Sequence, residues 1–316
     1  MDAKEKLLLW KTVMALQAVD ALKTSAKAIE LAKQNIEGSL SDDALLDECA
    51  GLKNEADIVA VRMFVNIIQN QFSISQFELV QIRKALFSDL VENPELLRVS
   101  NLSKKEWALD GLSLLYPKAA KIKTQLNKLF EAETLFDFKG MDSKKIIKHY
   151  ASFISDLWAL HPFENFNTRT IAVFFIKYLR YRGAPLSNDV LAQSAVYFRN
   201  ALARAAFCDG KKGFHKTTRY LERLIKKMLL GGRAVLDPRE THLFYDPNGV
   251  VLKVEGAPQK ELSVSDRLDE KLLAAKKEPA KKSAAPKAPA KKAPAKKAAD
   301  KKAPAKKSAP KKKSSK

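Results

Sequence analysis

The chain has 316 residues, with 57 lysines and arginines against 36 aspartates and glutamates, which gives a net charge of +21. Most of this excess lies in residues 271–316, where eighteen lysines face two acidic residues, so the remainder has the charge balance of an ordinary folded protein. Two distant cysteines exclude a disulfide framework or a cysteine zinc site. The longest apolar run is Ile171–Ile176, which is too short for a membrane span. Acidic residues near the first residue disfavour a cleaved signal peptide.

The N-terminal region has the periodicity of helices. Residues 7–36 repeat apolar side chains at helical spacing and are followed by Gly38, a residue suited to a left-handed helix cap. The pattern predicts one long helix or two shorter ones that break near residues 23–25, where a hydroxyl can cap the second. Residues 75–78 have capping-box spacing and predict another helix, with Leu79, Ile82 and Leu86 on its buried face.

Strand signals are few, so the fold class is mainly α. Asp110-Gly111 between two short apolar runs predicts a hairpin over residues 107–116. Residues 243–254 predict a second hairpin, appended to the helical body. The further helices that we expect are 146–160, 169–182, 198–205 and 217–230.

The end of the chain changes composition to repeats of Ala, Pro, Lys and Ser. Residues 271–316 hold six prolines and no aromatic residue, which predicts a disordered segment. Its lysines favour non-specific contact with nucleic acid, while a solubility extension is the alternative. We therefore expect a cytoplasmic protein with possible nucleoid association and no membrane partner. We expect four regions along the chain: N-terminal helices at 1–60, the helical core at 61–232, the second hairpin with a linker at 233–270, and the basic tail at 271–316.

The segment that carries chemistry is residues 161–170, HPFENFNTRT. It places His161 at the end of one expected helix and Arg169 at the start of the next. A helix N-terminus offers unpaired N–H groups and a positive dipole end, an arginine binds phosphate oxygens, and a histidine exchanges a proton near neutral pH. The segment therefore predicts a phosphate site, although a histidine beside an arginine is also a common structural arrangement.

This segment resembles the signature of the Fic (Fido) family, His-Pro-Phe-x-(Asp/Glu)-Gly-Asn-(Gly/Thr)-Arg. The resemblance extends over about residues 5–232 and implies a Fic-type helical fold with a short flap hairpin. The other segments that carry it are 29–38, 104–111, 172–180 and 197–202.

The resemblance implies transfer of AMP from ATP to a Ser, Thr or Tyr hydroxyl of a target protein. By position, His161 would be the general base and Phe163 would anchor the loop. Asn167 would hold a phosphate oxygen beside Thr168, and Arg169 would neutralise charge on the β-phosphate.

Two positions depart from the family pattern. Asn165 stands where an acidic residue would bind Mg²⁺, and a neutral amide is a poorer ligand for that cation. Phe166 stands where glycine allows a positive φ and a close approach to phosphate, both of which a phenylalanine resists. The second arginine of the longer motif is Ala172 here.

Glu37 lies where the family's inhibitory helix carries a glutamate that obstructs the γ-phosphate. The usual serine or threonine four residues earlier is Lys33, so the match is partial. The alternative is a plain helix end capped by Gly38.

The expected hairpin resembles the family's flap, which pairs with a target backbone as an added strand. Its residues are Trp107, Leu109, Asp110 and Gly111. The alternative is an ordinary surface hairpin. For the whole chain, the alternative function is a catalytically degenerate Fic-fold binding protein that its basic tail tethers to nucleic acid.

Overall fold

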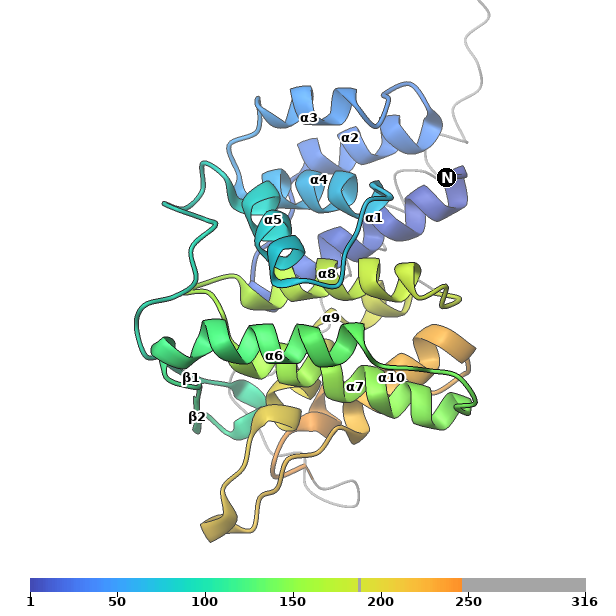
Figure 1. Cartoon of the computed structure of the whole chain (residues 1–316). Coiled ribbons are helices and arrows are strands. Elements are labelled where there is room, and N and C mark those ends of the chain that lie inside the picture. Colours follow the sequence, from blue (N-terminus) through green and yellow to red (C-terminus); the bar gives the residue numbers. More distant parts are fainter. Residues whose placement is uncertain (187–188, 246–316) are drawn as a thin grey trace, which may run out of the picture. The chain divides into compact units, whose positions relative to one another are not determined.

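The structure of the protein is a computed structural model that describes residues 1–186 and 189–245 (Figure 1). Contacts divide the chain into two units, Met1–Lys277 and Glu278–Lys316, and every described residue belongs to the first. Its α-helices are α1 (Ala3–Gln17), α2 (Ala26–Glu37), α3 (Ala44–Cys49), α4 (Glu55–Ile68), α5 (Gln76–Phe87), α6 (Ile122–Thr134), α7 (Ser143–Leu160), α8 (Asn167–Tyr181), α9 (Asp189–Ala206) and α10 (Arg219–Leu230). The short 3₁₀ turns are η1 (Ala18–Asp20), η2 (Trp107–Leu109), η3 (Ala119–Lys121), η4 (Gly210–Lys212) and η5 (Pro238–Thr241), and the strands are β1 (Ser103–Lys105) and β2 (Ser113–Leu115).

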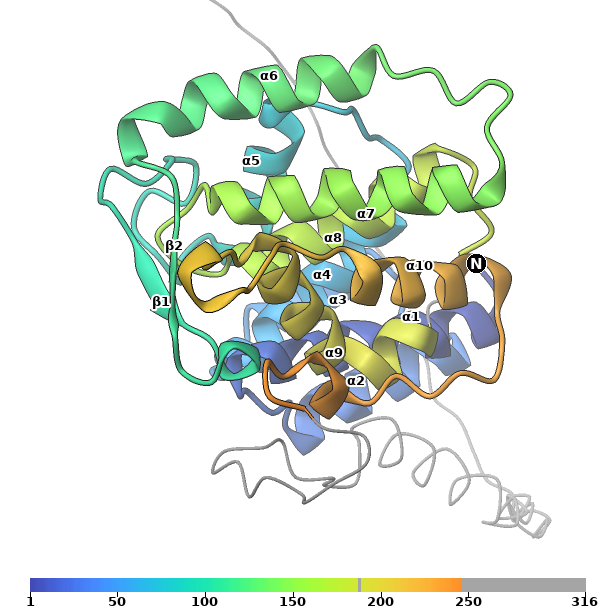
Figure 2. The ribbon, with the colours of Figure 1, turned by 90° about the horizontal axis from the view of Figure 1, so that it is seen from below.

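Helix α8 is the centre of the fold. All its residues from Asn167 to Leu179 are buried, and it packs against α1, α4, α5 and α7. A helix that is apolar on every side requires cover on every side, and the run Ile171–Ile176 supplies that composition. Figure 2 shows α7 between α6 and α10, an arrangement that agrees with the contacts among these helices.

Helices α1 to α4 form an N-terminal layer beside α8 and α9 (Figure 1). In this layer the ring of Trp10 stacks on Phe64, with centroids 4.4 Å apart. The Trp10 Nε1 donates a hydrogen bond to Asn35 Oδ1 at 3.0 Å, so the indole is both packed and satisfied. The layer thus brings residues from before position 60 against the same core as the later helices.

The predicted helix ends near the N-terminus are confirmed. The hydroxyl of Ser25 accepts a hydrogen bond from Lys27 N and caps α2, and Gly38 ends that helix with φ 83°. The hydroxyl of Ser75 accepts from Glu78 N at 3.1 Å and caps α5. These hydrogen bonds satisfy donors that a helix terminus otherwise leaves unpaired.

The hairpin at 107–116 exists, but its first strand was placed wrongly. Strands β1 and β2 are antiparallel and pair Ser103 with Leu115 and Lys105 with Ser113, while Trp107–Leu109 form η2 in the connecting turn. Ala108 and Leu109 are both fully buried. In a hairpin strand with one exposed face, two successive side chains would lie on opposite faces and one of them would be exposed. The Asp-Gly pair therefore marks the end of a longer loop rather than a two-residue turn.

Helices α3, α4 and α6 were not expected from the sequence. Of the predicted second hairpin, only Leu243–Tyr245 lie within the described residues, and they form a turn; the rest of that hairpin and residues 271–316 lie outside them. Across residues 1–186 and 189–245, no helix combines the length and the apolar composition that crossing a bilayer requires.

Candidate active site

The loop between α7 and α8 is held by its own side chains. His161 ends α7 in a left-handed conformation, with φ 48°. The side chain of Asn167 accepts a hydrogen bond from Phe163 N at 2.9 Å and donates one to Phe163 O at 2.7 Å. The Phe163 ring is fully buried, in the anchoring position expected for it. The Asn167 amide therefore shapes the loop in this conformation.

Phe166 adopts a positive φ of 63°, so the backbone conformation that a glycine would allow is present despite the resistance expected of a phenylalanine. A left-handed conformation costs about 1–2 kcal/mol for a residue with a side chain. The ring offsets this cost by stacking on Phe87, with centroids 4.5 Å apart, and by lying 4.7 Å from the guanidinium of Arg169. The loop thus keeps a glycine-like backbone and gains a ring that covers the arginine.

His161 is 2% exposed, and its ring stacks on Tyr116 at 3.9 Å and meets Trp158 edge to face at 5.4 Å. Neither ring nitrogen has a hydrogen-bond partner among the described residues. Burial lowers the pKa of His161 to about 2, and the positive charge of Lys104 contributes to this. Arg98 Nε holds the His161 backbone oxygen at 2.7 Å. The imidazole is therefore neutral in this conformation.

Arg169 is completely buried and engaged by three side chains of the N-terminal layer. Its guanidinium contacts Asp20 Oδ2 and Glu55 Oε1, each at 2.7 Å, and donates to Gln17 Oε1 at 2.9 Å. Asp20 also pairs with Arg199 Nη1 at 3.0 Å and so bridges two arginines. A phosphate can reach Arg169 only when these acceptors move aside.

The same charge network reaches the flap. Arg199 Nε contacts Glu106 Oε2 at 3.2 Å, and Glu106, 4% exposed, directly precedes η2. Sequence reasoning missed Asp20, Glu55, Arg199 and Glu106 as site residues. No local pattern marks them: Glu55, for example, has the position of any acid in the first turn of a helix.

The predicted Mg²⁺ position lacks a suitable donor set. Asn165 is exposed, and its backbone oxygen accepts a hydrogen bond from Arg83 Nη1 at 2.6 Å, which puts a positive charge beside the position. The adjacent Glu164 carboxylate is bound by the Ser100 hydroxyl at 2.9 and 3.0 Å. Within the described part of the chain no three His, Cys, Asp or Glu side chains gather as metal ligands. These residues do not fit a protein-held Mg²⁺.

The remaining predicted residues lie around this loop and at the flap. The Thr168 hydroxyl accepts from Trp158 Nε1 at 3.0 Å, so it is engaged within the protein. Glu37 is exposed at the end of α2, and the carboxylates that contact Arg169 belong to other residues. In the flap, Leu109 is buried and Asp110 is exposed with φ 54°. Trp107 is half-buried, and its ring centroid lies 4.9 Å from that of His242. Gly111 follows with φ 69°.

Comparisons with known proteins found one matching family and similar solved structures. The sequence model of the Fic/DOC family matches residues 73–179. One similar solved structure is a Fic family protein from Desulfovibrio desulfuricans G20, with 14% identity and a TM-score of 0.47 over 71% of this chain; this chain spans 62% of the length of that protein. Another is a Fic domain containing signaling protein from Bacteroides thetaiotaomicron VPI-5482, with 14% identity and a TM-score of 0.46 over 73% of this chain and 93% of that one.

No curated protein matches the sequence. The segment that the family model matches runs from the start of α5 to α8 and contains the flap and the loop of His161 and Arg169. The N-terminal layer lies outside it. Residues 73–179 are therefore the part of the chain in which it matches the Fic/DOC family.

Proposed function

We propose that the protein transfers AMP from ATP to a hydroxyl side chain of a target protein. The hydroxyl oxygen attacks the α-phosphorus, the bond from that phosphorus to the oxygen bridging to the β-phosphate breaks, and pyrophosphate leaves. The proton of the hydroxyl goes to a ring nitrogen of His161. Catalysis of this kind depends chiefly on positioning and on stabilising charge.

The observation that carries the proposal is the state of His161. Its ring is buried between two aromatic rings and both nitrogens lack hydrogen-bond partners within the described residues, although a buried polar group normally has one. A hydroxyl that entered the site would supply the missing partner. In this buried conformation the low pKa keeps the ring neutral. Opening of the site and approach of phosphate charge would raise that pKa toward the range in which a general base works at neutral pH.

The first turn of α8 and Arg169 supply the phosphate-binding groups. The N-terminal N–H groups of a helix bind anions, and Thr168 and Arg169 are in that first turn. Arg169 takes this role after Asp20 and Glu55 release it. The conformation described here is therefore the closed one, and we assign no Mg²⁺ ligand to this chain.

A second candidate is a Fic-fold binding protein without catalytic activity. The exposed Asn165 beside Arg83, in the place of a metal-binding acid, favours this alternative. It predicts that ATP or a target binds and that no label is transferred.

The test uses the full chain and ATP labelled at the α-phosphate. The paired variant D20N/E55Q should increase protein labelling, because both amides are weaker partners of Arg169 than the carboxylates. His161→Ala in that background should abolish labelling, while His215→Ala, a change at an exposed histidine, should leave it unchanged. Equal labelling with and without His161 would refute its role as base. ATP binding without labelling in D20N/E55Q would favour the binding protein.

A further inference from the structure

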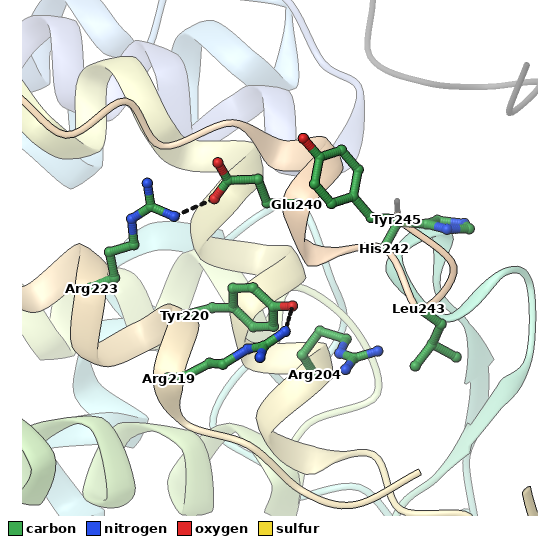
Figure 3. Close-up of a pocket in the computed structure, with 8 residues that line it drawn as sticks. All are labelled: Arg204, Arg219, Tyr220, Arg223, Glu240, His242, Leu243 and Tyr245. Carbon is green, nitrogen blue, oxygen red and sulfur yellow. Dashed lines mark hydrogen bonds and ion pairs between the residues drawn. The ribbon is translucent and has the colours of Figure 1, made fainter. Parts of the chain in front are cut away.

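A cavity of about 550 Å³ lies away from the loop of His161, between α9, α10 and the segment around η5 (Figure 3). None of its lining residues belongs to the motif at 161–170, so the cavity is separate from the site of the proposed function. The residues that line it are Arg204, Arg219, Tyr220, Arg223, Glu240, His242, Leu243 and Tyr245.

The lining carries an excess of positive charge. Arg223 is paired with Glu240 and also donates to Val235 O at 3.0 Å. Within the part of the chain that the structure describes, Arg204 and Arg219 have no carboxylate partner. Two guanidinium groups thus face the cavity without a counter-charge, which corresponds to an excess of about two positive charges.

These two arginines converge on one aromatic ring. The guanidinium of Arg219 lies 4.6 Å from the Tyr220 ring centroid and that of Arg204 lies 5.8 Å from it. Arg219 Nη2 also donates to the Tyr220 hydroxyl at 2.5 Å, as Figure 3 shows. Contacts with the ring fix the positions of the two charges without neutralising either of them.

Buried donors at this cavity lack acceptors. The Nε and Nη1 of Arg204 are buried and have no hydrogen-bond partner among the described residues. An unsatisfied buried donor of a charged group costs free energy, which an anion in the cavity would recover once the Arg204 side chain turned toward it. Burial lowers the pKa of Arg204, and the charge of Arg219 lowers it further, as expected for a cation that lacks an anion.

Tyr197 provides an independent observation. Its side chain is fully buried, its ring lies 6.4 Å from that of Tyr220, and its hydroxyl has no partner within the described residues. The charged groups that act on this hydroxyl are Arg223, Glu240 and Arg219, all of which line the cavity. A second kind of unpaired donor therefore lies near Tyr220, although Tyr197 itself does not line the cavity.

We propose that this cavity binds a small organic phosphate monoester, with the phosphate at Arg204 and Arg219 and the organic group against Tyr220, Leu243 and Tyr245. A phosphate monoester is close to a dianion at neutral pH and so matches the excess charge. The cavity has the volume of a small-molecule site, which is more than inorganic phosphate needs.

The site is joined to the flap. Leu243 N donates a hydrogen bond to Ala108 O at 2.9 Å, and His242 Nε2 lies 3.7 Å from Asp110 Oδ1. A ligand in this cavity would therefore contact the segment that supports the turn of the flap, although it would bind outside the candidate active site.

The test measures binding of phenyl phosphate to the full chain by titration calorimetry, with inorganic phosphate and benzoate as comparison ligands. Because charge-assisted hydrogen bonds contribute about 1.5–3 kcal/mol, Arg204→Gln and Arg219→Gln should each weaken binding about tenfold to a hundredfold. Arg219 is exposed, so its substitution leaves the core intact. Arg233→Gln is the matched control, because Arg233 is exposed and does not line the cavity.

A second readout is thermal unfolding with and without phenyl phosphate. Arg204→Gln removes an unpaired buried charge, so its melting temperature without ligand should equal or exceed that of the wild type. At the same concentration, phenyl phosphate should raise the melting temperatures of the wild type and R233Q more than those of R204Q and R219Q. Equal binding by R204Q, R219Q and R233Q would overturn the site, because the basic C-terminal segment would then account for it. Equal affinity for inorganic and phenyl phosphate would overturn the organic ligand.

Discussion

Asp20 is the residue whose charge should control access to Arg169. Its carboxylate bridges Arg169 Nε at 2.7 Å and Arg199 Nη1 at 3.0 Å, and its side chain is 28% exposed while Arg169 is fully buried. Hydrogen bonds to charged groups contribute about 1.5–3 kcal/mol. Because the substituted amide would keep one acceptor oxygen and the site is partly solvated, we expect Asp20→Asn to lower the free energy of unfolding by about 1–2 kcal/mol. For a folded unit of this size, the melting temperature should fall by about 2–8 °C.

The same change should strengthen ATP binding. The free energy needed to detach Arg169 from the N-terminal layer falls by the same amount, so the Kd for ATP should decrease about 5- to 30-fold. Thermal unfolding with and without ATP, together with titration calorimetry, measures both effects. Glu37→Gln is the matched control, because it makes the same kind of change at an exposed carboxylate.

Two results would refute this reasoning. A lower melting temperature in D20N without tighter ATP binding would mean that the network only stabilises the fold. Tighter ATP binding in E37Q and not in D20N would mean that Glu37 is the obstructing residue, as the sequence resemblance predicts.

Three further predictions concern the loop and the tail. The pKa of His161 is lower in the folded chain than in the unfolded chain, so the unfolded state binds the extra proton as the pH falls below 6.5 and the folded state loses stability. Between pH 6.5 and 4.5, His161 should lower the free energy of urea unfolding by about 2–3 kcal/mol. His242, whose pKa burial also lowers, should add to this loss, and His161→Gln should remove the part due to His161. Phe166→Gly should be more stable than Phe166→Ala by about 1 kcal/mol in the same assay, since both lose the ring but only alanine keeps the cost of positive φ; the reverse order would refute the left-handed conformation. Ending the chain near Leu273 should remove most binding to duplex DNA measured by fluorescence anisotropy, and an unchanged affinity at the same salt would place the contact elsewhere.

The parts of the fold that could be predicted depend on neighbouring residues. The caps at Ser25, Gly38 and Ser75 follow from the local competition for the unpaired groups of a helix terminus, which a few residues decide. The central helix follows from the uninterrupted apolar run that requires burial on all sides. The motif likewise brought His161 and Arg169 to adjacent helix ends, because only a short loop separates them.

The parts that were missed depend on distant contacts. The partners of Arg169 are 149 and 114 residues away in the chain, so no spacing could identify Asp20 or Glu55. The conformation of Phe166 depends on a ring contributed by Phe87, whose position only the packed structure provides. The first strand of the hairpin was misplaced for a related reason, since Ala108 is buried and this burial overrode the local turn signal.

The closed site also changes how a weak affinity for ATP should be interpreted. In the proposed function ATP binds at Arg169, which cannot hold a phosphate together with Asp20 and Glu55. ATP binding and the contact of the N-terminal layer would then be linked equilibria. The apparent affinity is then reduced by the fraction of molecules that are open, whatever the intrinsic quality of the phosphate site. Weak binding of ATP by the full chain would therefore be expected in two cases: an intact site that the N-terminal layer closes, and a degenerate site. Only the comparison with D20N separates them, because a substitution that shifts the linkage strengthens binding in the first case and has no effect on it in the second.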